Sequence, residues 1–342
     1  MKRRILWLVA WFSYYAGVDR LFYWLNRTAK RIITFHNVLP SALFKKDLTN
    51  GVSDSEESFR FIIREVGKRF SYSTDVLDAK TATITFDDGF LNQYEVAGRI
   101  LKEAGNIPAI VFVAGDELDN GDPANAIVVE QLLHWTAYAP DGTYGFPYCE
   151  AKRIVLTESN RGEVWVKHVR PAYASDSEFR GRRVLKTLDE QYPMARILDV
   201  LPMEYRRLRL TGISHAQADE LRGRGWKIGW HTKSHYPLSS LCAEEKRSEI
   251  TPPLGFQDVV FSYPYGETLS VDAESVRIAE SCGYPCAVSN LAVSNPLCGW
   301  FFMPRMSLPA DKYLLHFKLS GTENFLRTFS LLKNRNNTND GR

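Results

Sequence analysis

Short apolar runs rich in β-branched and aromatic residues alternate along this chain with segments of helical periodicity, and this alternation constrains the fold more than any other feature. Strands separated by helix-length segments are typical of parallel sheets, because a crossover helix returns the chain to the same edge. About seven strands are predicted, at 31–36, 83–87, 109–114, 226–231, 259–263, 286–290 and 300–305. The sequence therefore predicts an α/β fold built on a parallel sheet or barrel.

Helices are predicted between these strands at 91–104, 214–224, 243–250 and 271–282, the last with Ser270 as its N-cap. Residues 117–211 interrupt the alternation and read as one long, mostly helical insertion that covers or lines a substrate groove. We therefore expect an N-terminal hydrophobic helix at 1–30, a main domain at 31–321 that carries this insertion, and a polar tail at 322–342.

Composition excludes several classes of protein. A chain of 342 residues with 44% hydrophobic residues can bury a large core without disulfide or metal staples. Its formal charge of +3 is too small to attract polyanions, so no nucleic-acid partner is predicted. The five cysteines show no CxxC spacing, which argues against a disulfide framework and against a thiolate zinc site.

The N-terminus has three alternative interpretations beside a plain helix docked on the core. Basic residues at 2–4 precede an apolar run at 5–12 and an aromatic stretch to residue 25. A membrane span would need about 20 apolar residues, and polar residues from Ser13 onward interrupt this run. A cleaved leader would need small residues before its cleavage site, but Tyr14 stands near the best candidate. Helical spacing with basic flanks is typical of a membrane-surface helix, so residues 1–25 are a candidate for peripheral membrane contact.

The sharpest local feature is an apolar strand, Ile84-Thr85-Phe86, that runs directly into Asp87, Asp88 and Gly89. Two adjacent carboxylates are electrostatically costly unless a cation lies between them. One of them can hold a metal while its neighbour faces the attacking water. The structural alternative is an ordinary Asp-Gly turn.

A second strand ends in His231-Thr232-Lys233-Ser234-His235. On a helical turn two histidines four residues apart share a face, which is the spacing of a zinc pair. No carboxylate lies between them, so the base must come from elsewhere in the chain. Asp87 and Asp88 supply a base and a third ligand, which completes a set of two histidines and one carboxylate with open positions.

Two further strands end in residues suited to the same chemistry. The bend Tyr263-Pro264-Tyr265-Gly266 can expose a backbone N–H to an oxyanion, and Arg305 can pair with a carboxylate and hold it ionised. Polar residues at the C-terminal ends of several strands mark the active-site edge of an α/β barrel.

The sequence TFDDG at 85–89, the sequence HTxxH at 231–235 and the sequence YPYG at 263–266 resemble, in this order, the polysaccharide deacetylases, the NodB-like domains of carbohydrate esterase family 4. The resemblance covers residues 31–321 apart from the insertion. It implies a distorted (β/α) barrel of about seven strands and removal of acetyl groups from N-acetylated sugars.

The resemblance also implies a role for each motif residue. Asp87 would be the general base that activates a water held by the metal. Asp88, His231 and His235 would bind a divalent metal, which is usually zinc in this family. The backbone N–H of Tyr265, in the bend that begins at Pro264, would stabilise the oxyanion.

The chain departs from the family pattern at Ser262, where an arginine usually stands. We expect Arg305 to replace it. The general acid has two candidates. His316 follows a Leu-Leu pair as in the family, within a stretch at 313–319 that alternates like an added strand. His36 resembles the histidine that ends the first strand in deacetylases of exported polysaccharides.

The leading hypothesis is a metal-dependent hydrolase that removes N-acetyl groups from amino sugars of a polysaccharide, oligosaccharide or glycolipid. The alternatives are a carbohydrate O-acetyl esterase with the same site and a catalytically silent carbohydrate-binding relative. A place in a bacterial cell envelope is expected, with the cytoplasmic membrane face favoured and a periplasmic or secreted enzyme left open.

Overall fold

The computed structural model describes residues 2–49, 52–115, 127–175, 181–253, 256, 259–291 and 299–326. All seven predicted strands are present, several of them shorter than expected: β1 Arg31–Phe35, β5 Thr81–Phe86, β6 Ile110–Val113, β9 Lys227–Trp230, β10 Phe261–Ser262, β11 Ala287–Ser289 and β12 Met303–Pro304. Every residue of β1 is buried, as is typical of a parallel strand that is covered on both faces.

These strands form two parallel sheets, ordered β1-β5-β6-β9 and β10-β11-β12, with β4 (Ser71–Tyr72) paired to β5. The sheets meet where Met306, just beyond β12, bridges Ile33 of β1. The amide of Thr34 donates to the carbonyl of Met306 at 3.0 Å. No ladder joins β9 to β10 in the described residues, so the parallel α/β sheet is confirmed while a fully closed barrel stays a prediction.

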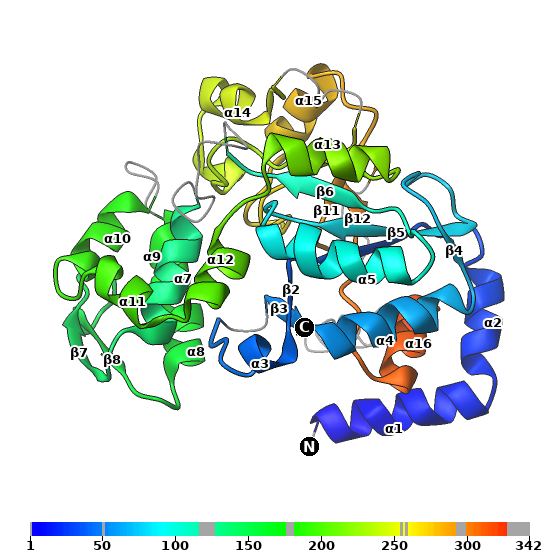
Figure 1. The fold of residues 1–342 in the computed structure, drawn as a ribbon, viewed down its shortest axis with the longest axis horizontal. Helices are drawn as coiled ribbons and strands as arrows, with labels where there is room; N and C mark the ends of the chain where they lie inside the picture. The colour runs from blue at the N-terminus through cyan, green and yellow to red at the C-terminus, as the bar shows by residue number, and fades with distance from the viewer. Residues whose placement is uncertain are drawn as a thin grey trace, which may run out of the picture.

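Helices surround the sheets, as Figure 1 shows. Their bounds are α4 Glu56–Gly67, α5 Gly98–Glu103, α13 His215–Gly223, α14 Ala243–Ile250 and α15 Ala273–Ser281, with a π-helical turn at Gln93–Ala97 before α5. All four predicted helices are confirmed, but the predicted cap of the last is wrong. Asp272 caps α15 by accepting from the amide of Ser275 at 2.8 Å, while Ser270 accepts from the amide of Glu267.

Short elements were not predicted between β1 and β4 or after β9. They are β2 Asn37–Leu39, α3 Ser41–Phe44, β3 Ser53–Ser55 and a 3₁₀ turn at Leu238–Ser240.

The insertion forms a group of helices beside the sheets, drawn in green in Figure 1. Its elements are α7 Val128–Tyr138, β7 Gly142–Gly145, β8 Arg153–Leu156, α8 Arg161–Val164, a π-helical turn Trp165–Val169, α9 Arg170–Ser175, α10 Arg182–Asp189, α11 Met194–Val200 and α12 Met203–Leu210. Within 127–175 and 181–210 most residues are helical, whereas the bounds of the insertion stay a prediction. The antiparallel hairpin of β7 and β8 was missed, because strands of four residues are too short for a readable alternation.

Two helices make the N-terminus, α1 Lys2–Tyr15 and α2 Val18–Leu25. The helical conformation is interrupted between them at Gly17. Its φ of 76° lies in the left-handed region, so α1 ends before this residue and α2 begins after it. Within the described residues no helix is both long enough and apolar enough to cross a membrane.

Helix α16, Lys312–Leu319, replaces the strand predicted at 313–319. Asp311 decides the difference, because its carboxylate accepts from the amides of Tyr313 and Leu314 at 3.0 Å and thereby begins a helix. The predicted tail starts inside the fold, since Thr322 is buried and donates to Asp19 at 3.1 Å. Its remainder, 327–342, lies outside the described residues.

Candidate metal centre

Parallel strands place the polar ends of four motifs at one edge. Asp87 and Asp88 follow β5, His231 follows β9, the bend at 263–266 follows β10, and Arg305 follows β12. At the first of these ends Asp88 takes the left-handed conformation, with a φ of 77°, so its side chain leaves the strand in a different direction from that of Asp87.

Asp88, His231 and His235 converge in the interior, with one ligand atom from each within 4.8 Å of the others. The Oδ1 atom of Asp88 lies 3.4 Å from Nε2 of His235 and 3.8 Å from Nε2 of His231. His231 donates from Nδ1 to the carbonyl of Ser262 at 2.7 Å. This hydrogen bond fixes the tautomer and leaves the Nε2 lone pair facing Asp88.

The two histidines meet through a loop rather than through the helical turn that their spacing suggested. Thr232 and His235 have φ values of 67° and 52°, and no helix includes them. The Oγ1 atom of Thr232 accepts from the amide of His235 at 3.1 Å and stabilises this loop. Left-handed backbone at non-glycine residues is costly and tends to gather at functional sites.

The donor set fits a divalent metal. Oδ1 of Asp88 is buried and has no hydrogen-bond donor among the described residues. Burial, reinforced by the negative charges of Glu130 and Asp87, raises the pKa of Asp88 well above its usual range, and a bound cation would remove that cost. Burial lowers the pKa of His231 to about 4 and that of His235 well below its ordinary value, so both imidazoles are neutral ligands at pH 7.

Arg305 forms a bidentate pair with Asp87. Its two terminal nitrogens donate to Oδ1 and Oδ2 of the carboxylate, each at 2.7 Å, and both side chains are fully buried. Burial alone would raise the pKa of Asp87, but the Arg305 guanidinium holds it well below its usual range. Asp87 is therefore a carboxylate that stays ionised.

Ser262 occupies the place where the family pattern has an arginine. Its hydroxyl accepts from Arg305 at 2.9 Å and donates to Oδ1 of Asp87 at 3.2 Å. Arg305 also donates to Thr85 Oγ1 at 3.1 Å and to the carbonyl of Ser289 at 3.2 Å. Five hydrogen bonds to these four neighbours fix the guanidinium at one position.

His36 lies just beyond β1, with its Nε2 atom 3.7 Å from Oδ2 of Asp87. Gln93 donates to the carbonyl of His36 at 2.8 Å and also to the carbonyl of Asp87, which ties the two strand ends together. Burial lowers the pKa of His36 below its ordinary value, and Asp87 partly opposes that change. Its side chain faces a cavity of about 480 Å³ that Asp88 and His235 also line.

The structure does not bring His316 to this cavity. His316 lies on α16, where its Nδ1 atom is 2.9 Å from the hydroxyl of Tyr23 and its Nε2 atom is 3.7 Å from Glu65. The ring of Tyr14 lies 5.4 Å away, measured between ring centroids. Of the two histidines considered for the general acid, His36 alone faces the base.

Tyr265 follows β10 in the left-handed conformation with a φ of 60°, and its ring lies 4.9 Å from the ring of His235. The carbonyl of Pro264 accepts from the amide of Gly266 at 2.6 Å and closes the bend. A Cβ atom at Gly266 would come within 2.3 Å of the amide nitrogen of Asn290, so only glycine fits there. The amide of Tyr265 has no acceptor among the described residues, which leaves it available as a donor.

The insertion contributes residues that motif reasoning missed. Glu130 of α7 and Trp165 line the cavity together with Asp88. Glu130 pairs with the fully buried Arg209 at 3.0 Å. The sequence did contain a signal for a buried, paired role of Glu130. Glu130 is the single carboxylate in the apolar stretch 127–133, and a charge in a buried segment is rarely left unpaired.

The chain matches no protein-family model and no curated protein. Among solved structures it is similar to the Streptococcus pyogenes deacetylase PplD in complex with acetate, at 12% identity and a TM-score of 0.47, covering 82% of this chain and 93% of that one. IcaB from Ammonifex degensii has 16% identity and a TM-score of 0.45, covering 85% and 96%. BC0361, a polysaccharide deacetylase from Bacillus cereus, has 13% identity and a TM-score of 0.45, covering 85% and 68%. Solved structures similar to this chain thus include polysaccharide deacetylases, and the likeness to them is distant.

Proposed function

We propose that this chain is a metal-dependent hydrolase that removes N-acetyl groups from amino sugars of a polysaccharide, oligosaccharide or glycolipid. One observation carries the proposal: Asp87, which Arg305 holds ionised, immediately precedes Asp88, and Asp88 forms a metal-binding set with His231 and His235. Asp88 and His235 of this set line the cavity. A base beside a metal-binding set with open positions is the arrangement that hydrolysis requires.

Asp88, His231 and His235 would hold the metal. A divalent ion such as zinc, when bound, would polarise the acetyl carbonyl and lower the pKa of the attacking water. The hydrogen bond from His231 to Ser262 keeps one imidazole oriented for this role.

Asp87 accepts the proton of the attacking water. Arg305 holds the carboxylate in place and ionised, so the base is available throughout the neutral range. Because its pKa is low, Asp87 holds that proton only briefly and passes it on.

His36 protonates the leaving amine. It is neutral at pH 7 in the free protein, since burial lowers its pKa, and it therefore has to gain a proton during the reaction. Nε2 of His36 lies 3.7 Å from Oδ2 of Asp87, which is beyond hydrogen-bond distance in the free protein, so the transfer requires the two groups to approach in the substrate complex. The amide of Tyr265 donates to the oxyanion.

The step from hydrolase to deacetylase rests on the motifs TFDDG, HTxxH and YPYG. In the structure these three meet at one edge, and the base has its cation although the usual arginine is absent. A cavity of 480 Å³ is within the range of small-molecule sites.

Acetate release tests the proposal. The purified protein is incubated with zinc and with N-acetylated or O-acetylated oligosaccharides, beside Asp87→Asn, which retains every metal ligand. We expect release from the N-acetylated substrates, and a fall of about 10²-fold or more in Asp87→Asn. Release from O-acetylated substrates alone would favour the esterase. Carbohydrate binding without any turnover would favour the silent relative.

A further inference from the structure

Helix α1 lies along the lower edge of the molecule in Figure 1, outside α4 and α16. Its outward stripe consists of Ile5, Leu8, Phe12 and Tyr15, each between 55% and 64% exposed. Spacings of three and four residues place these side chains on one helix face. A contiguous apolar stripe of this kind is costly in water and usually marks an interaction surface.

The inward face of α1 is already occupied. Ala10 and Ser13 are buried, and Trp7 donates to the carboxylate of Asp311 at 3.0 Å. The ring of Tyr14 packs edge-on against Tyr313 at 5.5 Å between ring centroids. These contacts fix the helix on α16, so the outward stripe cannot turn toward the core.

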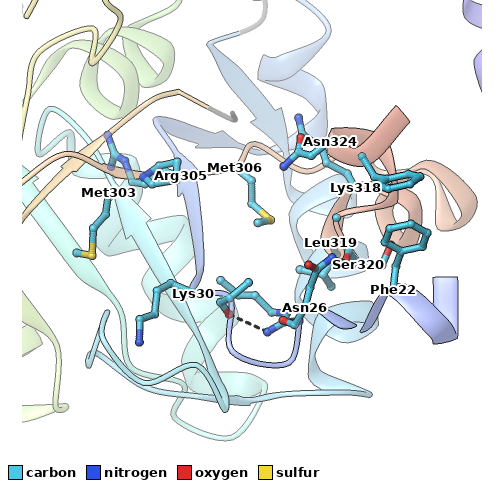
Figure 2. A pocket seen from close by; sticks show the side chains of 15 residues that line it. Phe22, Asn26, Lys30, Met303, Arg305, Met306, Lys318, Leu319, Ser320 and Asn324 are labelled. Carbon is cyan, nitrogen blue, oxygen red and sulfur yellow. Dashed lines mark hydrogen bonds between the residues drawn. The ribbon is translucent and has the colours of Figure 1, made fainter. Parts of the chain in front are cut away.

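The apolar surface continues onto α2, where Leu21, Trp24 and Leu25 are exposed. Phe22, which also lies on α2, packs on Phe325 at 4.9 Å between ring centroids, and Phe325 is exposed. Phe22, Leu319 and Phe325 line a recess of 410 Å³ between α2 and α16, shown in Figure 2. Apolar side chains therefore extend from the surface into the molecule.

The charges of the segment that forms this surface are almost all positive. Residues 2–30 contain six basic residues and one acidic residue. The acidic residue, Asp19, is buried and accepts from Ser13 at 2.6 Å. Arg4, Arg20 and Arg27 are exposed. An apolar face with a basic rim matches a bilayer whose headgroups are anionic.

We propose that the α1 face, defined by Ile5, Leu8, Phe12 and Tyr15, docks on an anionic phospholipid bilayer. Helix α1 has 14 residues, which is too short to cross a bilayer and long enough to lie in its interface. A second copy of the chain is the other possible occupant, but it would bring the two basic rims together and the like charges would repel. The bilayer supplies the opposite charge.

Co-sedimentation with vesicles tests this inference. The purified full chain is mixed with phosphatidylcholine vesicles that either contain or lack phosphatidylglycerol. We expect binding to the vesicles with phosphatidylglycerol, weakening as salt is added. Leu8→Glu combined with Phe12→Glu should lower the partition coefficient by about 100-fold, since each apolar side chain contributes roughly tenfold or more.

The matched control replaces two exposed apolar residues elsewhere, Met203→Glu combined with Leu269→Glu, and should bind as the parent does. Circular dichroism and metal content should be unchanged in both double variants, because none of the four positions contacts the metal centre. Equal binding by the Leu8→Glu, Phe12→Glu variant would overturn the proposal. A parent that ignores vesicles but dimerises in solution would assign the face to a second copy instead.

Discussion

At the scale of single residues, the arrangement of Asp87, Arg305 and Ser262 shows how the site keeps its base ionised. The family pattern has an arginine at the position of Ser262, and here the guanidinium comes from a different strand. The small hydroxyl side chain leaves room for Arg305 and hydrogen-bonds to it. The guanidinium of Arg305 therefore contacts the base from the end of β12.

Arg305→Ala should cut turnover by about 100-fold without loss of metal, because Asp87 would lose the cation that holds it ionised. The pKa of a buried Asp87 then rises, so the acid limb of the kcat/KM profile moves to higher pH. Steady-state acetate release across pH, beside metal analysis, measures both effects. Full activity and an unchanged profile in the variant would refute this role.

The same substitution at each of the two histidines considered for the general acid gives a test variant and its control. His36→Gln should lower turnover strongly and keep the metal, because His36 adjoins Asp87. His316→Gln should keep turnover, because His316 contacts Tyr23 and Glu65 and not the cavity. The reverse pattern in acetate release would assign the acid to α16.

His316 should instead affect stability in a pH-dependent way. Burial, with Arg69 as the next cause, lowers its folded pKa to about 4, against about 6.5 when unfolded. Between these values the unfolded state binds the extra proton, so this contribution to stability is lost as pH falls from 6.5 to 4. Relative to His316→Gln, the parent should lose about 2 kcal/mol across that window in urea unfolding. A constant difference between the two proteins would contradict a buried neutral histidine.

At the scale of elements, the strands and the active edge could be predicted, and the loops at that edge could not. Apolar runs located all seven strands because buried strands need continuous apolar sequence. The loop of 231–235 was mistaken for a helical turn, because spacing alone does not reveal the left-handed backbone at Thr232 and His235. The strand predicted at 313–319 failed because one cap, Asp311, outweighed the alternation. Glu130 could not be assigned to the site, because its position depends on how the insertion folds over the edge.

The insertion is expected to support the site through the pair of Glu130 and Arg209. Glu130→Gln leaves the buried guanidinium without its partner and should destabilise the fold by about 3 kcal/mol. It should also weaken the metal site by about tenfold, because a nearby negative charge is removed. Urea unfolding and metal titration measure the two effects separately.

Glu130→Gln combined with Arg209→Met provides the control. This double variant should recover most of the lost stability, because no buried charge remains unpaired. It should also recover part of the metal affinity, because the positive charge of Arg209 is removed together with the negative charge of Glu130. The stability losses of Glu130→Gln alone and of Arg209→Met alone complete the comparison. A loss in the double variant equal to their sum would show that the pair does not act as a unit.

At the scale of the whole molecule, three parts of the chain contribute differently to this account. They are the two sheets, the insertion and the N-terminal pair of helices. The sheets bring the strand-end motifs together, and the insertion lines the cavity above them. Figure 1 shows helices α1 and α2 at the lower right of the molecule, and α1 packs against α16 through Tyr14 and Tyr313. The exposed residues of α1 form the apolar face. Metal chemistry and surface binding should therefore be separable by mutation.

The most direct test of the account is the metal content of the purified protein after zinc is supplied, beside His235→Ala and Asp87→Asn. His235→Ala removes a ligand, whereas Asp87→Asn removes the base and leaves the ligand set intact. The account predicts about one bound ion per chain in the parent and in Asp87→Asn, and its loss in His235→Ala. A parent without metal, or a His235→Ala variant that retains it, would contradict the assignment of this centre.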